Sequence, residues 1–493
     1  MKNKRRSILK SSMCGGGMLL VPNLVTGKST SLSPKPMTRS FGRIEHNVTT
    51  MGLGGQASLM WTPADVNPEA IIHKALDRGI NYFDTSNIYG QSQTLIGKVF
   101  REHGLVAGLP GYSESKRRSI FLTSKTGLRL AKGYINGNVI GSTDGPKGSH
   151  ALDDVRRTLT QVFGDGKGYY PPGSYVDMVL IHYTGYPQID KYLYLGMDRP
   201  DPADEMIGAF AGLRDLRDGT NLTGLNPKHE KLIRYIGISG HSDPMQMMKI
   251  IQQDQYGLLD GILVPANAND KLHKNMQNNV IPVAKAKGLG VVGMKVFSDG
   301  AMYSKDAKFT EVPDEVVRSV GSKYMPSESL VKYSLTVPGV DVVIMGIGQI
   351  DNTDSRNCQL EQNLQAAQIG RNGLSQLDRE EIEQMAGRIK DGKTNYFQLP
   401  QESMSAPNHL KMEQKSNQIT FTWDTAFADK HIITHYDIVK NDVKIAQVKH
   451  TPQINETPFH FKDTRGQNNE VYKIVTVDAA GHTAESKEFI AKW

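Results

Sequence analysis

Four side chains of the types used for proton transfer follow short apolar segments of the sequence. Asp84, Lys125 and His182 each stand at the end of such a segment, and Tyr89 follows Asp84 by five positions. A carboxylate, a phenol, an ammonium and an imidazole suit general acid–base work when their surroundings adjust their pKa values. Where parallel strands lie side by side, the residues at their ends meet at one face. The sequence therefore predicts an acid–base site built from these four side chains.

The elements that must position them alternate between about residue 41 and residue 390. Helical stretches separate eight short β-rich runs: Val48–Leu53, Ile80–Asp84, Ile120–Ser124, Val176–His182, Ile233–Ser239, Asp260–Val264, Gly290–Val296 and Asp341–Gly346. Asn67, Pro68 and Glu69 fit the cap and first turn of one helix, which Gly79 ends. The alternation predicts a (β/α)8 TIM barrel over residues 41–395. A doubly wound open sheet is the alternative, but no GxGxxG follows the first strand.

The pattern changes after residue 395. Short alternating stretches with Gly, Asn and Asp turns predict a small all-β immunoglobulin-like sandwich over residues 408–493, after a linker at 396–407. The stretches ITFTWD, at 419–424, and VYKIVTVDAAGHTAES, at 471–486, resemble a fibronectin type III domain. Trp423 and Tyr472 fall where that fold keeps its core Trp and its corner Tyr, and packing is their expected role.

Four blocks of the barrel region resemble the aldo-keto reductase family. They are GINYFDTSNIYG at 79–90, FLTSKTG at 121–127, VDMVLIHYTG at 176–185 and IRYIGISGH at 233–241. Their order and their place at strand ends match the family. The resemblance implies hydride transfer between a nicotinamide cofactor and a carbonyl or alcohol substrate, which no side chain can perform alone.

The same resemblance implies a role for each catalytic residue. Tyr89 is the proton donor, Lys125 lowers the pKa of Tyr89, and Asp84 holds Lys125 in place. His182 binds and orients the substrate oxygen.

The resemblance also implies a cofactor site. The predicted cofactor contacts are Gly54, Asp84, Ser239, Gly240, Lys295, Phe297, Ser298, Gly300, Gly346 and Gly348. NADP is the family's usual cofactor, but Asp351 and Asp354 occupy the stretch where a 2′-phosphate would be gripped, and Arg356 matches only loosely. NAD therefore stays open, because an acidic residue suits a free ribose hydroxyl.

Composition and charge narrow the possible functions. The 493 residues carry a formal net charge of +7, which invites a nucleic-acid hypothesis. Six of the 58 Lys and Arg residues lie in the first 30 positions, which hold no acid, so 52 cations face 51 acids in the rest. The folded part is thus close to neutral, and no nucleic-acid partner is predicted. Two cysteines exclude a disulfide scaffold and a Cys-rich metal site, no metal is predicted, and no apolar run is long enough for a transmembrane anchor.

The first 35 residues have the anatomy of a signal peptide. Arg5-Arg6-Ser7-Ile8-Leu9-Lys10 resembles the twin-arginine motif and precedes a weakly apolar stretch. We therefore expect export by the twin-arginine machinery to the periplasm or the outside, with a cofactor loaded beforehand and tightly bound. A disordered basic tail or a nucleic-acid-binding arm is the alternative.

Two long segments follow the third and fourth strands, at 126–150 and 183–205, and a third excursion spans 298–326. The first two are expected to shape access to the substrate, and the third to cover the cofactor. Tyrosines 183, 186, 192 and 194 are candidates either for stacking on a sugar or for packing within their own loop.

The predicted function is that of an exported oxidoreductase acting on a small carbonyl compound or sugar. The alternative is a non-catalytic sensor that binds cofactor, or an adhesion protein that uses the barrel and β-module as a docking platform. Oligomeric state is not predicted.

Overall fold

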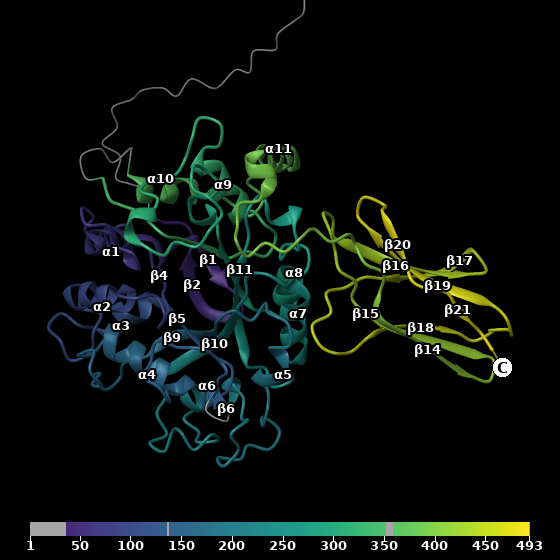
Figure 1. Cartoon of the computed structure of the whole chain (residues 1–493), viewed down its shortest axis with the longest axis horizontal. Coiled ribbons are helices and arrows are strands. Elements are labelled where there is room, and N and C mark those ends of the chain that lie inside the picture. Colours follow the sequence, from purple (N-terminus) through teal and green to yellow (C-terminus); the bar gives the residue numbers. More distant parts are fainter. Residues whose placement is uncertain (1–35, 136–137, 352–357, 493) are drawn as a thin grey trace, which may run out of the picture. The chain divides into compact units, whose positions relative to one another are not determined.

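Eight parallel strands close into a barrel in the computed structural model, which describes residues 36–492 apart from 136–137 and 352–357 (Figure 1). Each strand pairs with the next in sequence order, and the last pairs back with the first. The strands are β3 (Met51–Gly54), β4 (Tyr82–Asp84), β5 (Phe121–Leu128), β9 (Val176–Ile181), β10 (Ile233–Ser239), β11 (Leu259–Pro265), β12 (Gly290–Met294) and β13 (Val342–Met345). Each of the eight predicted runs overlaps one of them, although β3, β5 and β11 extend beyond the predicted bounds, so the TIM barrel is confirmed.

Helices follow the strands and cover the outside of the barrel. They are α1 (Pro68–Asp77), α2 (Ser92–Glu102), α4 (Ala151–Val162), α6 (Ala209–Asp218), α7 (Pro244–Gln253), α8 (Val280–Ala286), α9 (Ser327–Leu335) and α10 (Gln359–Ala366), with the additional α3 (Glu114–Ser119), α5 (Asp190–Leu193) and α11 (Gln376–Gly387). The predicted cap of α1 is confirmed, because the Asn67 side chain accepts hydrogen bonds from the N–H groups of Glu69 and Ala70. Gly79 follows the helix with a φ of 78°, which favours glycine.

A hairpin of β1 (Thr38–Phe41) and β2 (Ile44–Thr49) covers the end of the barrel opposite the catalytic face. The Phe41 ring lies 5.7 Å from that of Tyr82 and 5.3 Å from that of Phe121, among the side chains that fill the barrel interior. The predicted single strand Val48–Leu53 is wrong in one respect. The chain leaves the hairpin at Thr49 and enters the barrel at Met51, so two strands meet there.

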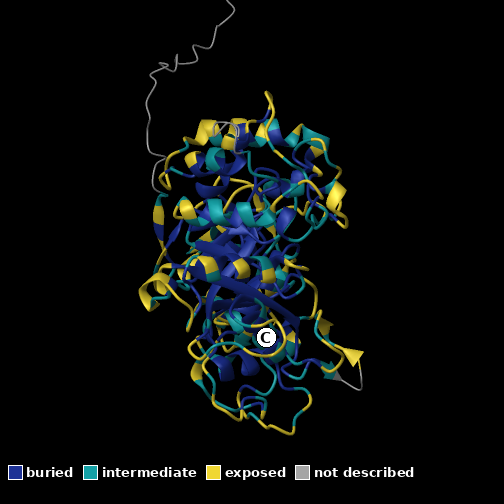
Figure 2. Ribbon diagram, turned by 90° about the vertical axis from the view of Figure 1, so that its left-hand side faces the viewer, coloured by how far each residue is buried: buried dark blue, intermediate teal, exposed yellow. Residues whose placement is uncertain are grey.

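Two layers of apolar side chains hold the barrel. The inner layer fills the space inside the strands, and the larger outer layer lies between strands and helices. Figure 2 shows the resulting arrangement, with buried residues on the strands and exposed ones on the outer helices and loops. Because the interior is packed, only the strand ends and their loops are left to form a site.

Two antiparallel sheets form the C-terminal module. One holds β14 (Asn408–Lys415), β15 (Gln418–Asp424) and β18 (Phe459–Asp463), and the other β16 (Ile433–Lys440), β17 (Val443–Lys449), β19 (Val471–Asp478), β20 (Thr483–Glu485) and β21 (Phe489–Ile490). Trp423 and Tyr472 are buried in the core that the sheets share, as expected for packing residues. The module is therefore the predicted β-sandwich, and its likeness to fibronectin type III stays a prediction.

Hydrogen bonds join the module to the barrel. The Asn279 side chain donates to the carbonyl oxygen of Ala428 and accepts from its N–H, and the Asn275 amide donates to the carbonyls of Ala428 and Asp429. Because these groups are mostly buried, they have to be paired.

The connections contain short elements of their own. They are β6 (Tyr134–Ile135), β7 (Asn138–Val139), β8 (Gly141–Ser142) and the 3-10 helices η1 (Ala57–Leu59), η2 (Asp270–Leu272), η3 (Ser298–Gly300), η4 (Pro313–Glu315) and η5 (Ile389–Gly392). Over the described part of the chain, no helix has both the length and the apolar character needed to cross a bilayer.

Candidate active site

The four predicted acid–base residues lie together at the carboxyl ends of adjacent barrel strands. Asp84 ends β4, Lys125 lies in β5, and His182 follows β9 directly. The Lys125 Nζ lies 4.7 Å from the centre of the Tyr89 ring, and the rings of Tyr89 and His182 are 5.9 Å apart in an edge-to-face contact. The structure thus brings all four side chains into one cluster.

Lys125 and Asp84 form a buried ion pair. The Nζ of Lys125 donates to both carboxylate oxygens of Asp84, at 2.8 and 2.7 Å, and to the carbonyl oxygen of Thr85, at 2.8 Å. Burial raises the pKa of Asp84 and lowers the pKa of Lys125, while their mutual attraction opposes both shifts. An ammonium has three N–H donors, and all three are used here.

This arrangement corrects one expectation about Tyr89. Lys125 has no donor left for the phenol oxygen, and it faces the ring of Tyr89 instead. Burial, followed by the negative charge of Asp84, raises the pKa of Tyr89 well above its ordinary value. The expected lowering by Lys125 is wrong for this environment, and Tyr89 is protonated at neutral pH.

His182 is held as a neutral imidazole. Burial, followed by the positive charge of Lys125, lowers its pKa well below the ordinary value. Its ring stacks on that of Tyr183 at 3.8 Å, and its Nδ1 has no hydrogen-bond partner among the described residues. A neutral, unpartnered imidazole beside a protonated phenol can bind an oxygen atom of a ligand.

Three aromatic residues at this site were missed in the sequence. His241 is buried, both of its ring nitrogens lack partners within the described residues, and its ring stacks on Phe397 at 4.4 Å. Tyr396 precedes Phe397, and its hydroxyl accepts a hydrogen bond of 2.8 Å from the Nζ of Lys295. Tyr396 and Phe397 lie in the stretch that the sequence predicts as a linker, where no local signal distinguishes them.

Arg129, at the end of β5, is a buried guanidinium near the site. Its Nη2 donates to the Tyr183 carbonyl at 3.3 Å, and its Nη1 has no acceptor in the described part of the chain. Burial lowers the pKa of Arg129 to about 10, so it stays charged at neutral pH. Its positive charge, with those of Lys125 and Lys295, is among the causes that keep His182 neutral.

A cavity of about 120 Å³ opens beside the catalytic cluster. Seven of the predicted cofactor residues line it: Gly54, Asp84, Lys295, Phe297, Ser298, Gly300 and Gly346. Glycine matters at Gly346, because a Cβ there would come within 2.9 Å of the Ala57 Cβ. The Ser239 hydroxyl, at the end of β10, is buried without a partner among the described residues. An unpartnered hydroxyl and this glycine-lined wall fit a nicotinamide dinucleotide.

Three predicted cofactor residues, Ser239, Gly240 and Gly348, do not line this cavity. A Cβ on Gly240 would meet the Met247 sulfur at 2.1 Å, and one on Gly348 would meet the Val317 carbonyl oxygen at 2.1 Å. Close packing therefore explains both glycines. The residues Asp354 and Arg356, which bear on the choice between NAD and NADP, lie outside the described residues.

The long loops 183–205 and 298–326 contribute different residues to the candidate active site. Of the tyrosines in 183–205, Tyr183 reaches the site, whereas Tyr194 is half-buried against Phe210 and donates to the Ile250 carbonyl. The excursion 298–326 contributes Val317 and Val320 to the cavity wall.

A model of the Aldo/keto reductase family matches residues 50–386, a span that holds all eight barrel strands. The chain belongs to the aldo/keto reductase family. The catalytic cluster and the cavity beside it are therefore the candidate active site of an aldo/keto reductase barrel.

Two oxidoreductases and a solved aldo/keto reductase are similar to this chain. The uncharacterized oxidoreductase YqkF of Bacillus subtilis (strain 168) is 23% identical over 369 residues, 71% of this chain and 96% of YqkF. The uncharacterized oxidoreductase YrpG of the same organism is 24% identical over 246 residues, 48% of this chain and 60% of YrpG, so the match spans less than two thirds of that relative. A solved aldo/keto reductase from Klebsiella pneumoniae in complex with NADP and acetate is 16% identical and covers 71% of this chain and 95% of that chain, with a TM-score of 0.43.

The replacement Lys125→Met is expected to destabilise the barrel by about 3–5 kcal/mol, because it leaves the Asp84 carboxylate buried without a counter-charge. The double replacement Asp84→Asn with Lys125→Met is expected to be less destabilised than the single one. The difference between the two proteins is expected to shrink as pH falls through the raised pKa of Asp84, since a protonated carboxyl needs no counter-charge. Urea unfolding measures both effects, and equal stability of the two variants at neutral pH would contradict the argument.

Proposed function

We propose that the barrel catalyses hydride transfer between a nicotinamide dinucleotide and a carbonyl or alcohol group, with Tyr89 as the proton donor. The observation that carries this proposal is the convergence of Asp84, Tyr89, Lys125 and His182 at the carboxyl ends of adjacent strands. Membership of the aldo/keto reductase family supports it.

Each residue has a distinct role in reduction. Tyr89 is protonated because it is buried, and it gives its proton to the oxygen of the substrate carbonyl. His182 binds that oxygen as a neutral imidazole and orients it. The charges of Arg129 and Lys295 stabilise the negative charge that develops there. Lys125 and Asp84 position Tyr89 by fixing the ends of β4 and β5.

The nicotinamide, when bound, supplies the hydride. The residues proposed to hold the dinucleotide are Ser239, Gly54, Gly346 and the segment from Lys295 to Gly300. NADP is what the family resemblance implies, and NAD is the alternative. The cavity is smaller than the roughly 300–1,000 Å³ of typical ligand sites, so residues that line it have to shift when the dinucleotide binds.

The substrate is proposed to be a small carbonyl compound or a sugar. Tyr183, Tyr396 and Phe397 border the site and offer aromatic faces to such a molecule. We further propose that the C-terminal module is fibronectin type III-like.

Replacement of Tyr89 by Phe is expected to lower the rate of carbonyl reduction by about 10³-fold, because the proton donor is lost. Binding of the dinucleotide is expected to remain, since the ring is retained. Steady-state kinetics over a panel of aldehydes, ketones and sugars with both cofactors, together with fluorescence titration of NADPH, measures the two effects. Dinucleotide binding without turnover in the unaltered protein would favour the alternative of a non-catalytic sensor.

A second expectation concerns the charge of Lys295. Burial lowers the pKa of Lys295 to about 8, so this side chain is charged below that pH and neutral above it. If Lys295 contacts the dinucleotide, affinity for NADPH falls by about tenfold between pH 7 and pH 9 as that charge is lost. In Lys295→Met the affinity is weaker and loses this pH dependence, whereas Lys98→Met, on the outer helix α2, behaves as the unaltered protein. Fluorescence titration across the pH range checks this, and an unchanged slope in Lys295→Met contradicts it.

We propose in addition that the protein is exported by the twin-arginine route with its dinucleotide already bound. The motif at Arg5 and Arg6 supports this, and folded export explains how a nicotinamide enzyme keeps its cofactor outside the cytoplasm. The exported fraction is expected to contain protein with bound nicotinamide dinucleotide, detected by native mass spectrometry. The control variant with Arg5→Lys and Arg6→Lys is expected to stay in the cytoplasm. Export of that control, or exported protein free of dinucleotide, would count against the proposal.

A further inference from the structure

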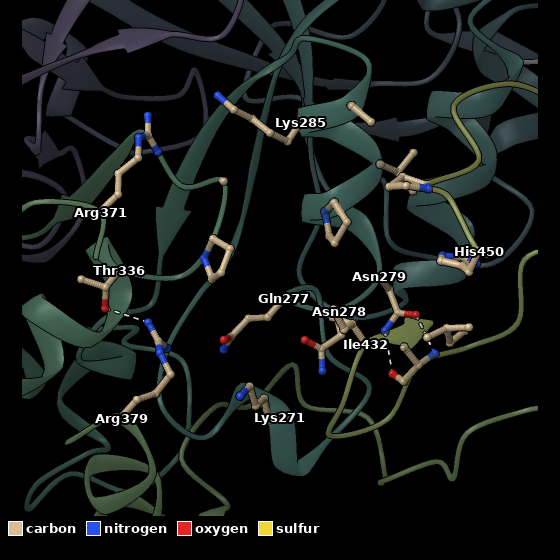
Figure 3. A pocket seen from close by; sticks show the side chains of 18 of the residues that line it. Lys271, Gln277, Asn278, Asn279, Lys285, Thr336, Arg371, Arg379, Ile432 and His450 are labelled. Carbon is tan, nitrogen blue, oxygen red and sulfur yellow. Dashed lines mark hydrogen bonds between the residues drawn. The ribbon is translucent and has the colours of Figure 1, made fainter. Parts of the chain in front are cut away.

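A cleft of about 790 Å³ lies on the outer wall of the barrel, apart from the catalytic cavity. Its barrel side consists of α8, the segment from Thr336 to Gly339, and residues 371–379 at the start of α11. Its other side consists of loops of the C-terminal module, among them Ile432, His450 and Pro452 (Figure 3). No residue of the proposed active site lines this cleft.

The charged residues that line the cleft are all cations. They are Lys271, Lys285, Arg371 and Arg379, and no aspartate or glutamate is among the described lining residues. Two carboxylates that do not line the cleft, Asp341 and Glu383, pair with these cations and balance part of their charge.

Lys285 and Arg371 share one carboxylate. Arg371 Nη2 lies 2.5 Å, and Lys285 Nζ 3.4 Å, from the same Oδ1 of Asp341, whose side chain is fully buried. The side chains of Lys285 and Arg371 are 44% and 42% exposed, so both remain accessible from the cleft. This group keeps one unbalanced positive charge.

Lys271 pairs with the Glu383 carboxylate, and Arg379 lies against the ring of Tyr333, which donates to that carboxylate. Lys271 Nζ lies 2.9 Å from Oε1 of Glu383, which accepts a hydrogen bond of 2.6 Å from the Tyr333 hydroxyl. The Arg379 guanidinium lies 4.3 Å from the centre of the Tyr333 ring. Arg379 donates to the Thr336 hydroxyl and the Tyr333 carbonyl, and it forms no ion pair within the described residues. Lys271 also faces Asp270, whose pKa burial raises to about 7, so the positive charge left without a carboxylate partner among the described residues of this group is that of Arg379.

The two groups lie at opposite ends of the cleft. Figure 3 shows Lys285 and Arg371 toward one end and Lys271 and Arg379 toward the other. Uncharged side chains also line the cleft, including Pro282 and Pro338. The amides of Gln277 and Asn278 are already used, by Asn267 and Asp429.

We propose that this cleft binds an extended dianion, a molecule with two carboxylate groups joined by an uncharged spacer. Each carboxylate would balance the excess charge of one group, and Arg371 and Arg379 would offer it planar pairs of donors. A cleft lined by one sign of charge concentrates ions of the other sign, and ligand sites occur preferentially at such junctions of domains. The dianion is either a free dicarboxylic acid or a stretch of an acidic polysaccharide.

The test is isothermal titration calorimetry on the full chain with linear α,ω-dicarboxylates from succinate to sebacate, with trigalacturonate, and with acetate as the single-charge reference. We expect one spacer length, or trigalacturonate, to bind at least about tenfold more tightly than acetate. Tightest binding by a dicarboxylate assigns the free acid as the ligand, and tightest binding by trigalacturonate assigns the polysaccharide.

The variants Lys285→Gln and Arg379→Gln each remove one end of the site, and each is expected to reduce this affinity to the level of acetate. Lys98→Gln is the matched control for Lys285→Gln, because Lys98 is also an exposed, singly paired lysine on an outer helix. It is expected to change nothing. Lys285 is exposed, so its variant is expected to fold, which an unchanged melting temperature verifies. The proposal is overturned if no dianion binds more tightly than acetate, or if affinity is unaffected in both variants or equally reduced in the control.

Discussion

Two charges at the open end of the barrel, the Lys125 ammonium and the Asp84 carboxylate, have to satisfy each other because water does not reach them. Their side chains are 0% and 3% exposed, and each belongs to a different strand. An unpaired charge at this depth would cost several kcal/mol. The pair thereby fixes the ends of β4 and β5 relative to each other, and Tyr89 follows from the turn after β4. The geometry of the proton donor therefore rests on this ion pair.

The polar groups around the cavity divide into two kinds. Lys125 has every donor satisfied, whereas Ser239, His241 and Arg129 keep buried polar atoms without partners in the described chain. A fully satisfied group is rigid, and an unsatisfied one is available to a ligand. The satisfied pair thus serves as the frame of the site, and the unsatisfied atoms around it form the surface that recognises a ligand.

The local sequence was sufficient to predict the barrel and the catalytic cluster. The eight short β-rich runs predict the strands, and the polar residues at the ends of three of these runs, with Tyr89 five positions after Asp84, predict the cluster. His241 and Phe397 were missed because their contact depends on a segment that returns to the site from beyond the last barrel helix. The pKa of Tyr89 was misjudged because a sequence does not tell how many donors of Lys125 are already used.

The position of Tyr396 and Phe397 changes where the catalytic unit ends. By secondary structure the barrel stops before these residues, and a boundary at residue 395 would cut them away. The active site, however, depends on this segment, because Tyr396 accepts a hydrogen bond from Lys295 and Phe397 stacks on His241. The segment continues within about ten residues into the first strand of the sandwich. An insertion or deletion between α11 and β14 would therefore alter substrate preference. For the same reason, exchanging the sandwich for another module at this junction would change the active site.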